Sequence, residues 1–441
     1  MKKKLPVMPA AARDVEAASA AGLSIQPQLA LAELEGAIKE GLLAFSCATG
    51  MLVIAEMMEA ERARIVGPKG KHDPARVAER NGSAPGSVVL GGRTVPVSRP
   101  RAVRSDGGGE IGLDSYAVFS ATDLLTQVAL ERMLAGVATR RHLLVGEPVG
   151  EALEARARSV SKSAISRRFK TATEAKLAEL LARDLTGLDV AAMMIDGIIF
   201  ADCCVVVALA ITTDGTKVPV GLWEGDTENK IVVTDLLADL VARGLECADG
   251  VLFVLDGSKA LAGGVKRVFG DRALIQRCVL HKRRNLDGYL PDGYAQMIDR
   301  QLAKAFNDVD PARGLRVATG IAAQLDEHYP SAAASLREGL EDMFTVRRLG
   351  ASDRLARSLS CTNAVESMIS VVQRLSGRVT NWKDPKMVRR WVGVGMLEAE
   401  RSFRRIKGCK DMPALTAAIR AEVARRRAAD ASVEDNQDAV A

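Results

Sequence analysis

The pattern of apolar and polar positions changes near residue 189. Before it, apolar residues mostly recur at helical spacing, and after it they form short, almost continuous runs. Three such runs read as consecutive strands, at 191–200, 203–215 and 216–225, with TTDGT at 212–216 as the turn between the last two. This part of the chain is therefore expected to begin a sheet.

Helices and strands alternate in the stretch that follows. The spacing predicts an amphipathic helix at 229–245, a buried strand at 251–257, a helix at 259–270 and a strand at 273–280. Three antiparallel strands followed by helix, strand, helix and strand indicate a mixed α/β domain.

The remaining chain is mostly helical in pattern. Apolar spacing predicts helices at 28–64 and 121–144, and no strand-like run occurs at 291–359. Residues 87–101 differ, because two β-branched runs flank Gly91-Gly92. They predict a hairpin, since glycine supplies the positive φ values that a two-residue turn needs.

Composition narrows the class of protein. The chain has 441 residues, 48% of them hydrophobic, and a net charge of +6, which indicates a folded protein rather than a disordered one. Seven cysteines without framework spacing indicate a reducing compartment. The basic start is not read as a signal peptide, because Pro6 and Pro9 interrupt its short apolar part. The apolar run at 203–211 is too short to cross a bilayer, so we expect a soluble, cytoplasmic protein.

Basic residues occur in bursts, a distribution typical of nucleic-acid binding. The alternative for any single burst is a solvated helix face. The bursts are Arg93, Arg99, Arg101 and Arg104; Arg167, Arg168 and Lys170; Lys282, Arg283 and Arg284; and Arg401, Arg404, Arg405 and Lys407.

The second burst lies in SVSKSAISRRFK at 159–170. Ser161 or Ser163 can cap a helix whose first turns present four polar residues, as a recognition helix does. These are Ser166, Arg167, Arg168 and Lys170. A helix at 136–144 would complete a helix-turn-helix, although the intervening segment is longer than a standard turn. The alternative is a capped basic surface helix.

Two aspartates interrupt buried strands: Asp196 lies inside MMIDGIIF, and Asp256 ends VLFVLDG. Burying an unpaired carboxylate is costly, and hard divalent cations with oxygen ligands relieve the repulsion between adjacent carboxylates. Glu366, near the start of a helical stretch, can add a third carboxylate. The alternatives are Asp-Gly turns that end the strands, and a capping box between Asn363 and Glu366.

Four motifs occur in a fixed order: MMIDGIIF at 193–200, VLDGSKAL at 254–261, RCVLHKRRN at 277–285 and TNAVESMISVVQRLSGRV at 362–379. In order and spacing they resemble the bacterial insertion-sequence transposases related to eukaryotic Mutator elements. The resemblance covers most of residues 70–410. It implies a ribonuclease-H-like core with an all-helical insertion, preceded by a mostly helical DNA-binding region.

The resemblance also implies a site. Asp196, Asp256 and Glu366 would form a DDE triad holding two Mg²⁺ ions, with Mn²⁺ as a substitute. Cys278 and His281 match a family signature, but they are half of a zinc site and no zinc ion is predicted. Predicted DNA contacts are Arg99, Arg101, Ser166, Arg167, Arg168, Lys170, Lys282, Arg283 and Arg284.

The function implied is a DNA transposase that acts on double-stranded DNA as a dimer or larger assembly. It would bind the terminal inverted repeats, hydrolyse the phosphodiester at the element ends and join the 3′-OH to target DNA. The alternatives are a structure-specific nuclease and a transposase-derived DNA-binding protein that no longer uses its catalytic site.

The predicted organisation has six parts. They are a disordered segment at 1–27, a DNA-binding region at 28–185, the first part of the core at 186–290, the helical insertion at 291–359, the final core helix with Glu366 at 360–410, and a C-terminal helix with a tail, disordered after 420, at 411–441.

Overall fold

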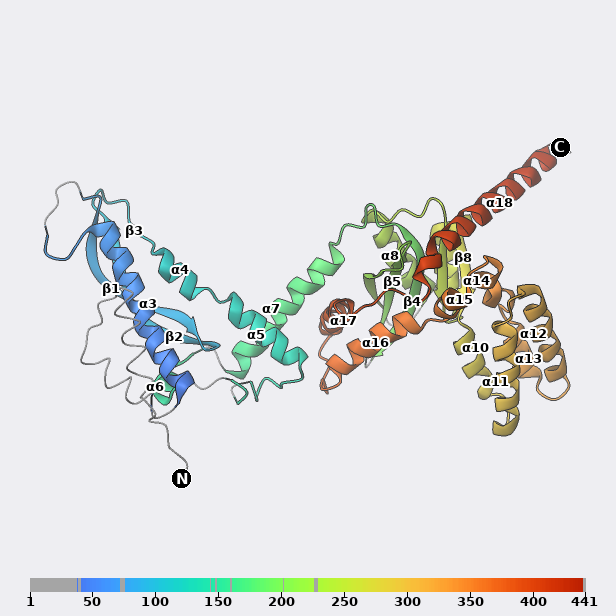
Figure 1. The fold of residues 1–441 in the computed structure, drawn as a ribbon, viewed down its shortest axis with the longest axis horizontal. Helices are drawn as coiled ribbons and strands as arrows, with labels where there is room; N and C mark the ends of the chain where they lie inside the picture. Colours follow the sequence, from blue (N-terminus) through green and yellow to red (C-terminus); the bar gives the residue numbers. More distant parts are fainter. Residues whose placement is uncertain are drawn as a thin grey trace, which may run out of the picture. The chain divides into compact units, whose positions relative to one another are not determined.

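The computed structural model describes residues 38, 41–71, 76–142, 144–146, 149–158, 161–200, 202–225 and 229–438. The chain divides into two compact units, Met1–Ala172 and Thr173–Ala441, whose elements Figure 1 labels along the sequence. The segment predicted to be disordered at 1–27 lies outside the described residues.

The first unit is built on a long hairpin. Strands β1 (Ala78–Leu90) and β2 (Arg93–Arg104) pair antiparallel, and the short β3 (Glu110–Ile111) pairs with β2. Gly91 and Gly92, at the turn, have φ of 55° and 73°. The predicted hairpin is therefore confirmed, together with the reason for its two glycines.

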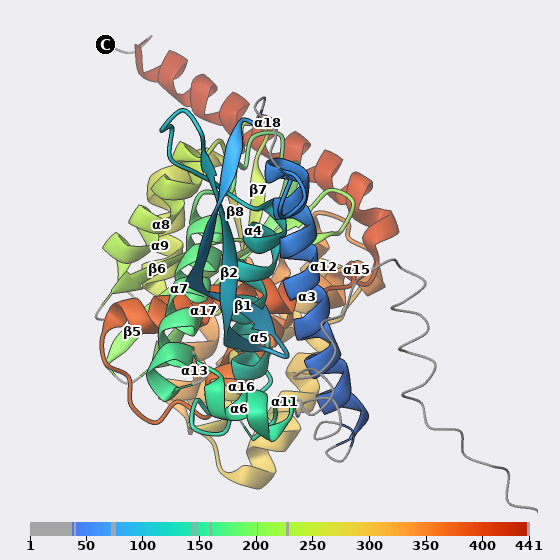
Figure 2. The ribbon, with the colours of Figure 1, turned by 90° about the vertical axis from the view of Figure 1, so that its left-hand side faces the viewer.

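Helix α3 (Leu42–Val66) is long and apolar enough, by length and composition, to cross a bilayer. In this unit it packs on the hairpin, and Figures 1 and 2 both show it running beside β1 and β2. Ile54 and Met58 are buried in that contact, and Glu59 forms a salt bridge with Arg80 of β1. These are the contacts of a helix that belongs to a folded unit.

The helix predicted at 121–144 is shorter than expected. It appears as α5 (Asp123–Leu134), after α4 (Asp114–Ser120). Gly136, at φ 86°, ends α5 in a Schellman motif: its N–H bonds to the Met133 carbonyl, and the next N–H bonds to the Arg132 carbonyl. The described residues that follow are turns, so the helix predicted at 136–144 is wrong.

The predicted helix-turn-helix therefore lacks its first helix. The element before α7 (Lys162–Leu181) is instead the short α6 (Glu151–Arg156). The alternative, a capped basic helix, describes α7 better, because the Ser161 hydroxyl accepts a hydrogen bond from the Ala164 N–H at 3.3 Å.

The second unit contains a five-stranded sheet of order β6-β5-β4-β7-β8. Pairing is antiparallel between β4 and β5 and between β5 and β6, and parallel between β4 and β7 and between β7 and β8. All five strands predicted from apolar runs are confirmed. They are β4 (Val190–Phe200), β5 (Cys203–Thr212), β6 (Lys217–Gly225), β7 (Val251–Leu255) and β8 (Ala273–Arg277).

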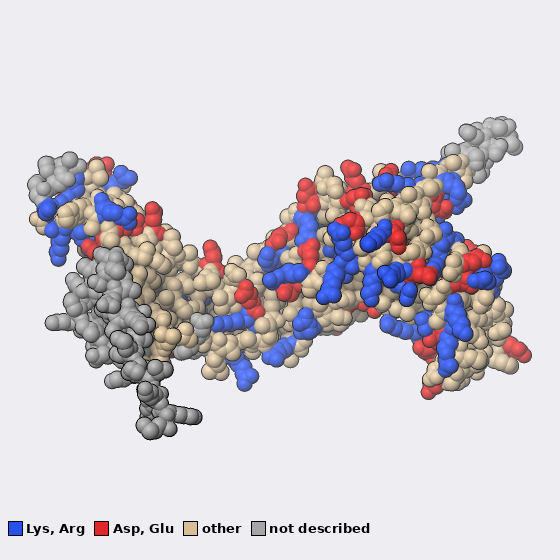
Figure 3. Space-filling model, viewed as in Figure 1, with Lys and Arg blue, Asp and Glu red and all other residues tan. Residues whose placement is uncertain are grey.

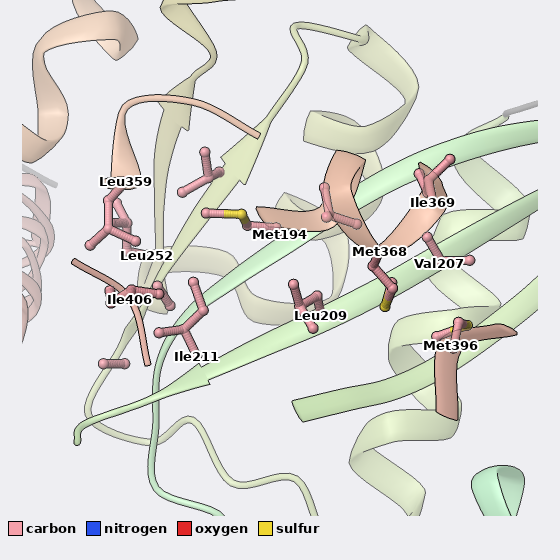
Figure 4. Packing of buried hydrophobic residues seen from close by; sticks show 14 of the residues in the cluster. Met194, Val207, Leu209, Ile211, Leu252, Leu359, Met368, Ile369, Met396 and Ile406 are labelled. Atoms are coloured by element: carbon pink, nitrogen blue, oxygen red, sulfur yellow. The ribbon is translucent and has the colours of Figure 1, made fainter. Parts of the chain in front are cut away.

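Both faces of this sheet are covered by helices. Met193 contributes to a core with α8 (Lys230–Ala242) and α9 (Lys259–Phe269), whereas the next residue, Met194, contributes to a core on the opposite face. That second core includes α16 (Asn363–Ser376) and α17 (Pro385–Glu400). Figure 4 shows Met194, Val207 and Leu209 of the sheet packed with Met368, Ile369 and Met396 of these helices.

The block between β8 and α16 is helical throughout, as predicted, and has a hydrophobic core of its own. Pro311 and Pro330 occupy first-turn positions of their helices, where proline lacks only an N–H that would be unpaired. The elements are α10 (Val279–Asp287), α11 (Asp292–Phe306), α12 (Pro311–Asp326), α13 (Pro330–Arg337), the 3₁₀ turn η2 (Glu341–Phe344), α14 (Thr345–Arg348) and α15 (Asp353–Leu359).

The tail after residue 420 was expected to be disordered, and this is wrong for most of its length. Helix α18 runs from Met412 to Asp438, after the 3₁₀ turn η3 (Cys409–Asp411). Ile419 and Val423 are buried in the core, and Arg427 pairs with Asp271 at 2.5 Å. These contacts hold residues 419–427 of α18 against the rest of the unit. Polar composition alone therefore wrongly predicted disorder after residue 420.

Candidate active site

The parallel pairing of β4 with β7 brings two aspartates together. The last paired positions are Ile195 in β4 and Leu255 in β7. Asp196 follows the first of these residues and Asp256 follows the second. Every residue of β7 is buried, and so are the β4 residues that precede Asp196. The two carboxylates therefore emerge side by side where apolar strands reach the edge of the core.

Each aspartate accepts one backbone hydrogen bond. The Gly197 N–H donates to Oδ1 of Asp196 at 2.9 Å, and the Ser258 N–H donates to Oδ1 of Asp256 at 2.8 Å. Asp256 thus forms a turn at the end of its strand, as one alternative predicted. Asp196 does not end its strand, because it pairs with Val207 inside the ladder. Within the described part of the chain, neither aspartate forms a salt bridge with a basic side chain.

The electrostatics of Asp196 are unusual for a carboxyl group. Burial, together with the nearby charges of Asp256 and Glu366, raises its pKa to about 7, against the lowering effects of the Gly197 N–H and His281. A carboxyl group held in this way has too little positive charge around it. An external cation bound at this site would therefore interact favourably with the carboxylates.

Glu366 reaches the same place from helix α16. The helix begins at Asn363 with Thr362 as its N-cap residue, so the capping box between Asn363 and Glu366, which was the alternative reading of this glutamate, does not form. Instead, the Thr362 hydroxyl donates to Oε1 of Glu366 at 2.6 Å. Since this contact is side chain to side chain, it fixes the carboxylate rather than the end of the helix.

Thr362 lies at the centre of a polar cluster that also includes the signature pair. Its hydroxyl oxygen is 3.4 Å from Sγ of Cys278, 3.2 Å from Nδ1 of His281 and 2.6 Å from Glu366. Strand β8 ends earlier than predicted because Cys278 is the N-cap of α10, where its sulfur accepts from the His281 N–H at 3.5 Å. The residues before α10 and before α16 thus meet at the carboxylate of Glu366.

Cys278, His281 and Glu366 are also arranged as potential metal ligands, with ligand atoms within 4.8 Å of one another. Thr362, however, lies within hydrogen-bonding distance of all three. Its single proton suits the carboxylate, which is the stronger acceptor. We therefore interpret Thr362, Cys278 and His281 as a hydrogen-bonded support for Glu366 and not as part of a separate zinc site.

The support carries a positive charge. The hydrogen bond with Cys278, together with the charges of Glu366 and Asp196, raises the pKa of His281 to about 9, against the lowering effect of burial. Burial raises the pKa of the Cys278 thiol, but its contacts with His281 and Thr362 outweigh this and leave it lowered. The imidazolium of His281 thus partly balances the acidic side chains.

Two of the three cations in the basic burst on α10 form contacts within the protein. Lys282 is 6% exposed and donates to the Ser335 carbonyl, which does not fit the phosphate contact predicted for it. Arg283 forms a bidentate pair with Asp299, at 2.6 and 2.7 Å, and so is committed to α11. Arg284 differs, because its side chain is 60% exposed and lies 3.8 Å from Glu366.

The other predicted DNA contacts belong to the first unit. Arg99 and Arg101 share Glu110 as an ionic partner, at 2.5 and 3.0 Å, which offsets part of their charge. On α7, Arg167 is exposed, and Arg168 has a pKa lowered by burial and by Arg167. Ser166 and Lys170 are also exposed.

Thr362 is the site residue that the sequence did not single out. A threonine four positions before a glutamate is a usable signal, but it was overshadowed by Asn363, the more familiar capping residue. Its partners Cys278 and His281 lie more than 80 positions earlier in the chain, at separations of 84 and 81. No local pattern joins residues so far apart.

Comparison with known proteins matches the chain to one family and to several named relatives. Residues 29–405 match the family described as "Transposase, Mutator family". The chain is 28% identical over 205 residues to "Transposase for insertion sequence element IS6120" from Mycolicibacterium smegmatis, a match covering 45% of this chain and 62% of that protein.

Two further relatives carry similar names. "Transposase for insertion sequence element IST2" from Acidithiobacillus ferrooxidans is 25% identical over 178 residues, covering 40% of this chain and 59% of the relative. "Probable transposase for insertion sequence element ISRM3-like" from Sinorhizobium fredii is 27% identical over 171 residues, covering 38% and 42%. The matches thus span less than two thirds of each of these relatives.

Proposed function

The chain belongs to the Mutator family of transposases, and from this premise we propose that it is a DNA transposase of the DDE type. Asp196, Asp256 and Glu366 are its catalytic carboxylates. The observation that carries the proposal is the parallel register of β4 and β7, which sets the two aspartates side by side within reach of the charge on Glu366.

The topology supports a ribonuclease-H-like core. Three antiparallel strands are followed by two parallel strands on the other side of β4, with helices on both faces. The helical insertion lies between β8 and α16, and α16 returns a carboxylate to the first strand. That arrangement is what the resemblance to DDE transposases requires.

The residues present fit a divalent metal. All three carboxylates offer oxygen ligands, which suit Mg²⁺ or Mn²⁺, and Asp196 forms no salt bridge among the described residues, although His281 lies near enough to lower its pKa. When bound, a pair of such ions makes water a better nucleophile and stabilises both oxygens of an in-line phosphoryl displacement. Asp196, Asp256 and Glu366 would hold the ions.

The chain's own residues orient this site. Thr362 and His281 fix the carboxylate of Glu366, and the Gly197 and Ser258 N–H groups fix the two aspartates. In the hydrolysis, water oxygen attacks the phosphorus at the element end, and the bond to the 3′ oxygen breaks to leave a 3′-OH. In the joining step, that 3′-OH attacks a target phosphodiester and displaces the neighbouring 3′ oxygen.

Recognition of the terminal repeats is assigned to the first unit. Exposed residues of α7, Ser166, Arg167 and Lys170, together with Arg168 and the hairpin residues Arg99 and Arg101, are the proposed contacts. Joining two ends requires two sites, so the active form is a dimer or larger assembly on DNA. The reaction requires access to chromosomal DNA, which places the protein in the cytoplasm.

The second candidate function is a structure-specific nuclease that cuts without joining, since the same carboxylates serve both reactions. A DNA-binding protein without catalysis is disfavoured by the presence of all three carboxylates.

The test uses a duplex carrying the end of the element that encodes this chain, with Mg²⁺. The wild type is compared with Asp256→Asn and Glu366→Gln, and with Glu327→Gln as a control, since Glu327 is exposed on the helical insertion. We expect the wild type and the control to nick and join. Both site variants should bind the duplex without doing either. Nicking without joining would favour the nuclease. Full activity of Glu366→Gln would show that Glu366 is not a catalytic residue.

A further inference from the structure

The second unit has an open groove lined by cations from two segments of the chain. One segment is α15, and the other connects α17 to α18. We call this surface the basic groove. Its exposed cations are Arg354, Arg357, Arg404, Arg405, Lys407 and Lys410.

The two segments are held together closely. Gly408 has a φ of 86°, and a Cβ at this position would come within 2.6 Å of the Leu355 nitrogen. The Ser358 hydroxyl donates to the Lys407 carbonyl at 2.9 Å, and the Ile406 N–H donates to the Gly215 carbonyl at 3.0 Å. The backbone that carries the groove is therefore fixed, while its long side chains extend into solvent.

Most of the charge in the groove is not balanced by the protein. Arg405 pairs with Asp214 at 2.9 Å, but the other exposed cations make no salt bridge with any residue that the structure describes. Asp411, the acidic residue of the lining, is already engaged by the Ser352 hydroxyl at 2.5 Å. Figure 3 shows Lys and Arg side chains gathered on this face of the second unit, between α16 and α18.

The groove borders the candidate active site. Asn363, Ala364 and Ser367 of α16 line it, and Glu366 lies on the same turn of that helix. The side chain of Glu366 is directed to Thr362 and His281. One turn of helix thus separates the exposed cations of the basic groove from the three carboxylates, which His281 balances only in part.

The chemistry of the lining selects among polyanions. Spaced cations match the regular charges of a sugar–phosphate backbone. Single strands are usually held by aromatic side chains on which bases stack, and no aromatic residue occurs in the lining among the described residues. The groove therefore suits a duplex contacted through its phosphates.

Resting on the proposed function, we propose that the basic groove holds the target duplex that receives the 3′-OH. Arginine and lysine contacts with phosphates carry no sequence information, which suits DNA that is accepted without a fixed sequence. The end of the element, by contrast, has a defined sequence to be read. That reading is assigned to the first unit.

The test compares the full-length wild type with the double variant Arg354→Glu/Arg404→Glu. The matched control is Arg300→Glu/Arg316→Glu, which reverses two exposed arginines of α11 and α12. A milder pair, Arg354→Gln/Arg404→Gln, guards against misfolding, and thermal unfolding followed by circular dichroism checks all four proteins.

Binding is measured first, without metal, by fluorescence anisotropy of a random-sequence duplex over a series of salt concentrations. The groove variant should bind about tenfold or more weakly than wild type, with a salt slope reduced by about 2, since each lost phosphate contact removes about 0.9. The glutamine pair should lie between them. Binding equal to wild type, or an equal loss in the control, would overturn the proposal.

Catalysis is measured second, with Mg²⁺ and a labelled element end. Nicking of the end should stay within about twofold of wild type, while joining to a target plasmid falls about tenfold, in line with the weaker phosphate binding. Equal losses of nicking and joining would show that the groove holds the element end and not the target. A wild type that neither nicks nor joins would contradict the proposed function, while the binding comparison would still decide whether the groove holds DNA.

Discussion

Helices α10 to α13 of the insertion and the sheet edge at Asp196 lie in one unit but differ in how their charges are balanced. In helices α10 to α13 of the insertion, three arginines have acidic partners nearby. Arg283 pairs with Asp299, Arg313 with Asp308 and Arg337 with Asp326. At the sheet edge, Asp196 has other carboxylates as neighbours, and in the basic groove most cations face solvent with no acidic partner among the described residues.

The difference separates structural charges from functional ones. A salt bridge that closes within the protein fixes one helix against another and leaves little charge for a ligand. Same-sign charges gathered at one place cost stability, and they are retained where an external ion or polyanion balances them. This explains why Lys282 and Arg283, although they lie in a basic burst, are not part of the proposed DNA surface.

The largest expected effect comes from removing the unbalanced charge of Asp196. The Asp196→Asn protein, free of metal at pH 8, should be about 2–4 kcal/mol more stable than wild type, yet inactive. The folded pKa of about 7 lies above the unfolded value, so the wild type is destabilised as pH rises from about 4 to 7. Chemical unfolding in EDTA at both ends of this range measures the gain, which should vanish near pH 4. A loss of stability at pH 8 would contradict the account.

Removing the support of Glu366 should have the next largest effect. Thr362→Val deletes the hydroxyl that joins Glu366 to His281, and end cleavage should fall about 10- to 100-fold, as for other residues that orient ligands. Thr362→Ser keeps the hydroxyl and should retain most activity. The Mg²⁺ concentration needed for half-maximal rate should rise only in the valine variant. Equal behaviour of the two variants would assign Thr362 a packing role.

Two glycine substitutions compare the packing of α17 in the core of the second unit with that of α12 in the insertion. A Cβ on Gly395 of α17 would come within 2.8 Å of the Val372 side chain on α16, so Gly395→Ala should lower the free energy of unfolding by about 1–2 kcal/mol. Gly320, in α12, has no neighbour within 4 Å of a built Cβ, and Gly320→Ala should raise it by about 0.5–1 kcal/mol. Urea unfolding of both variants measures the contrast. Destabilisation by Gly320→Ala would contradict the open surface assigned to α12.

The smallest effect is expected for a balanced charge. Arg283→Met breaks the bidentate pair with Asp299 and should cost about 1 kcal/mol of stability, because both side chains are partly exposed. The salt slope of duplex binding should stay unchanged, since this arginine is not expected to contact phosphate. A salt slope reduced by about 1 would show that Arg283 contacts a DNA phosphate.

The sequence predicted the features that depend on local patterns. Continuous apolar runs revealed all five strands of the second unit, and Asp196 was visible because it interrupts one of them. The Gly91-Gly92 turn was predictable because two neighbouring residues determine it. The helix at 136–144 was wrong although Gly136, a typical helix terminator, was present in the sequence.

Features that depend on distant partners could not be predicted. The partner of Arg283 is Asp299 and that of Lys282 is the Ser335 carbonyl, both in the insertion, so spacing gave no sign that these cations are internal. The role of Thr362 depends on Cys278, which lies 84 positions away. The length of α18 depends on contacts with Asp271 and the core, and not on its own polar composition.

The central claim is that Asp196, Asp256 and Glu366 hold a divalent cation, and direct binding of Mn²⁺ tests it without any DNA. Electron paramagnetic resonance measures free Mn²⁺ during a titration of the wild type, of Asp196→Asn and of the Glu327→Gln control. We expect the wild type and the control to bind Mn²⁺ that excess Mg²⁺ displaces, and Asp196→Asn to lose that binding. Equal binding by Asp196→Asn and wild type would contradict the claim.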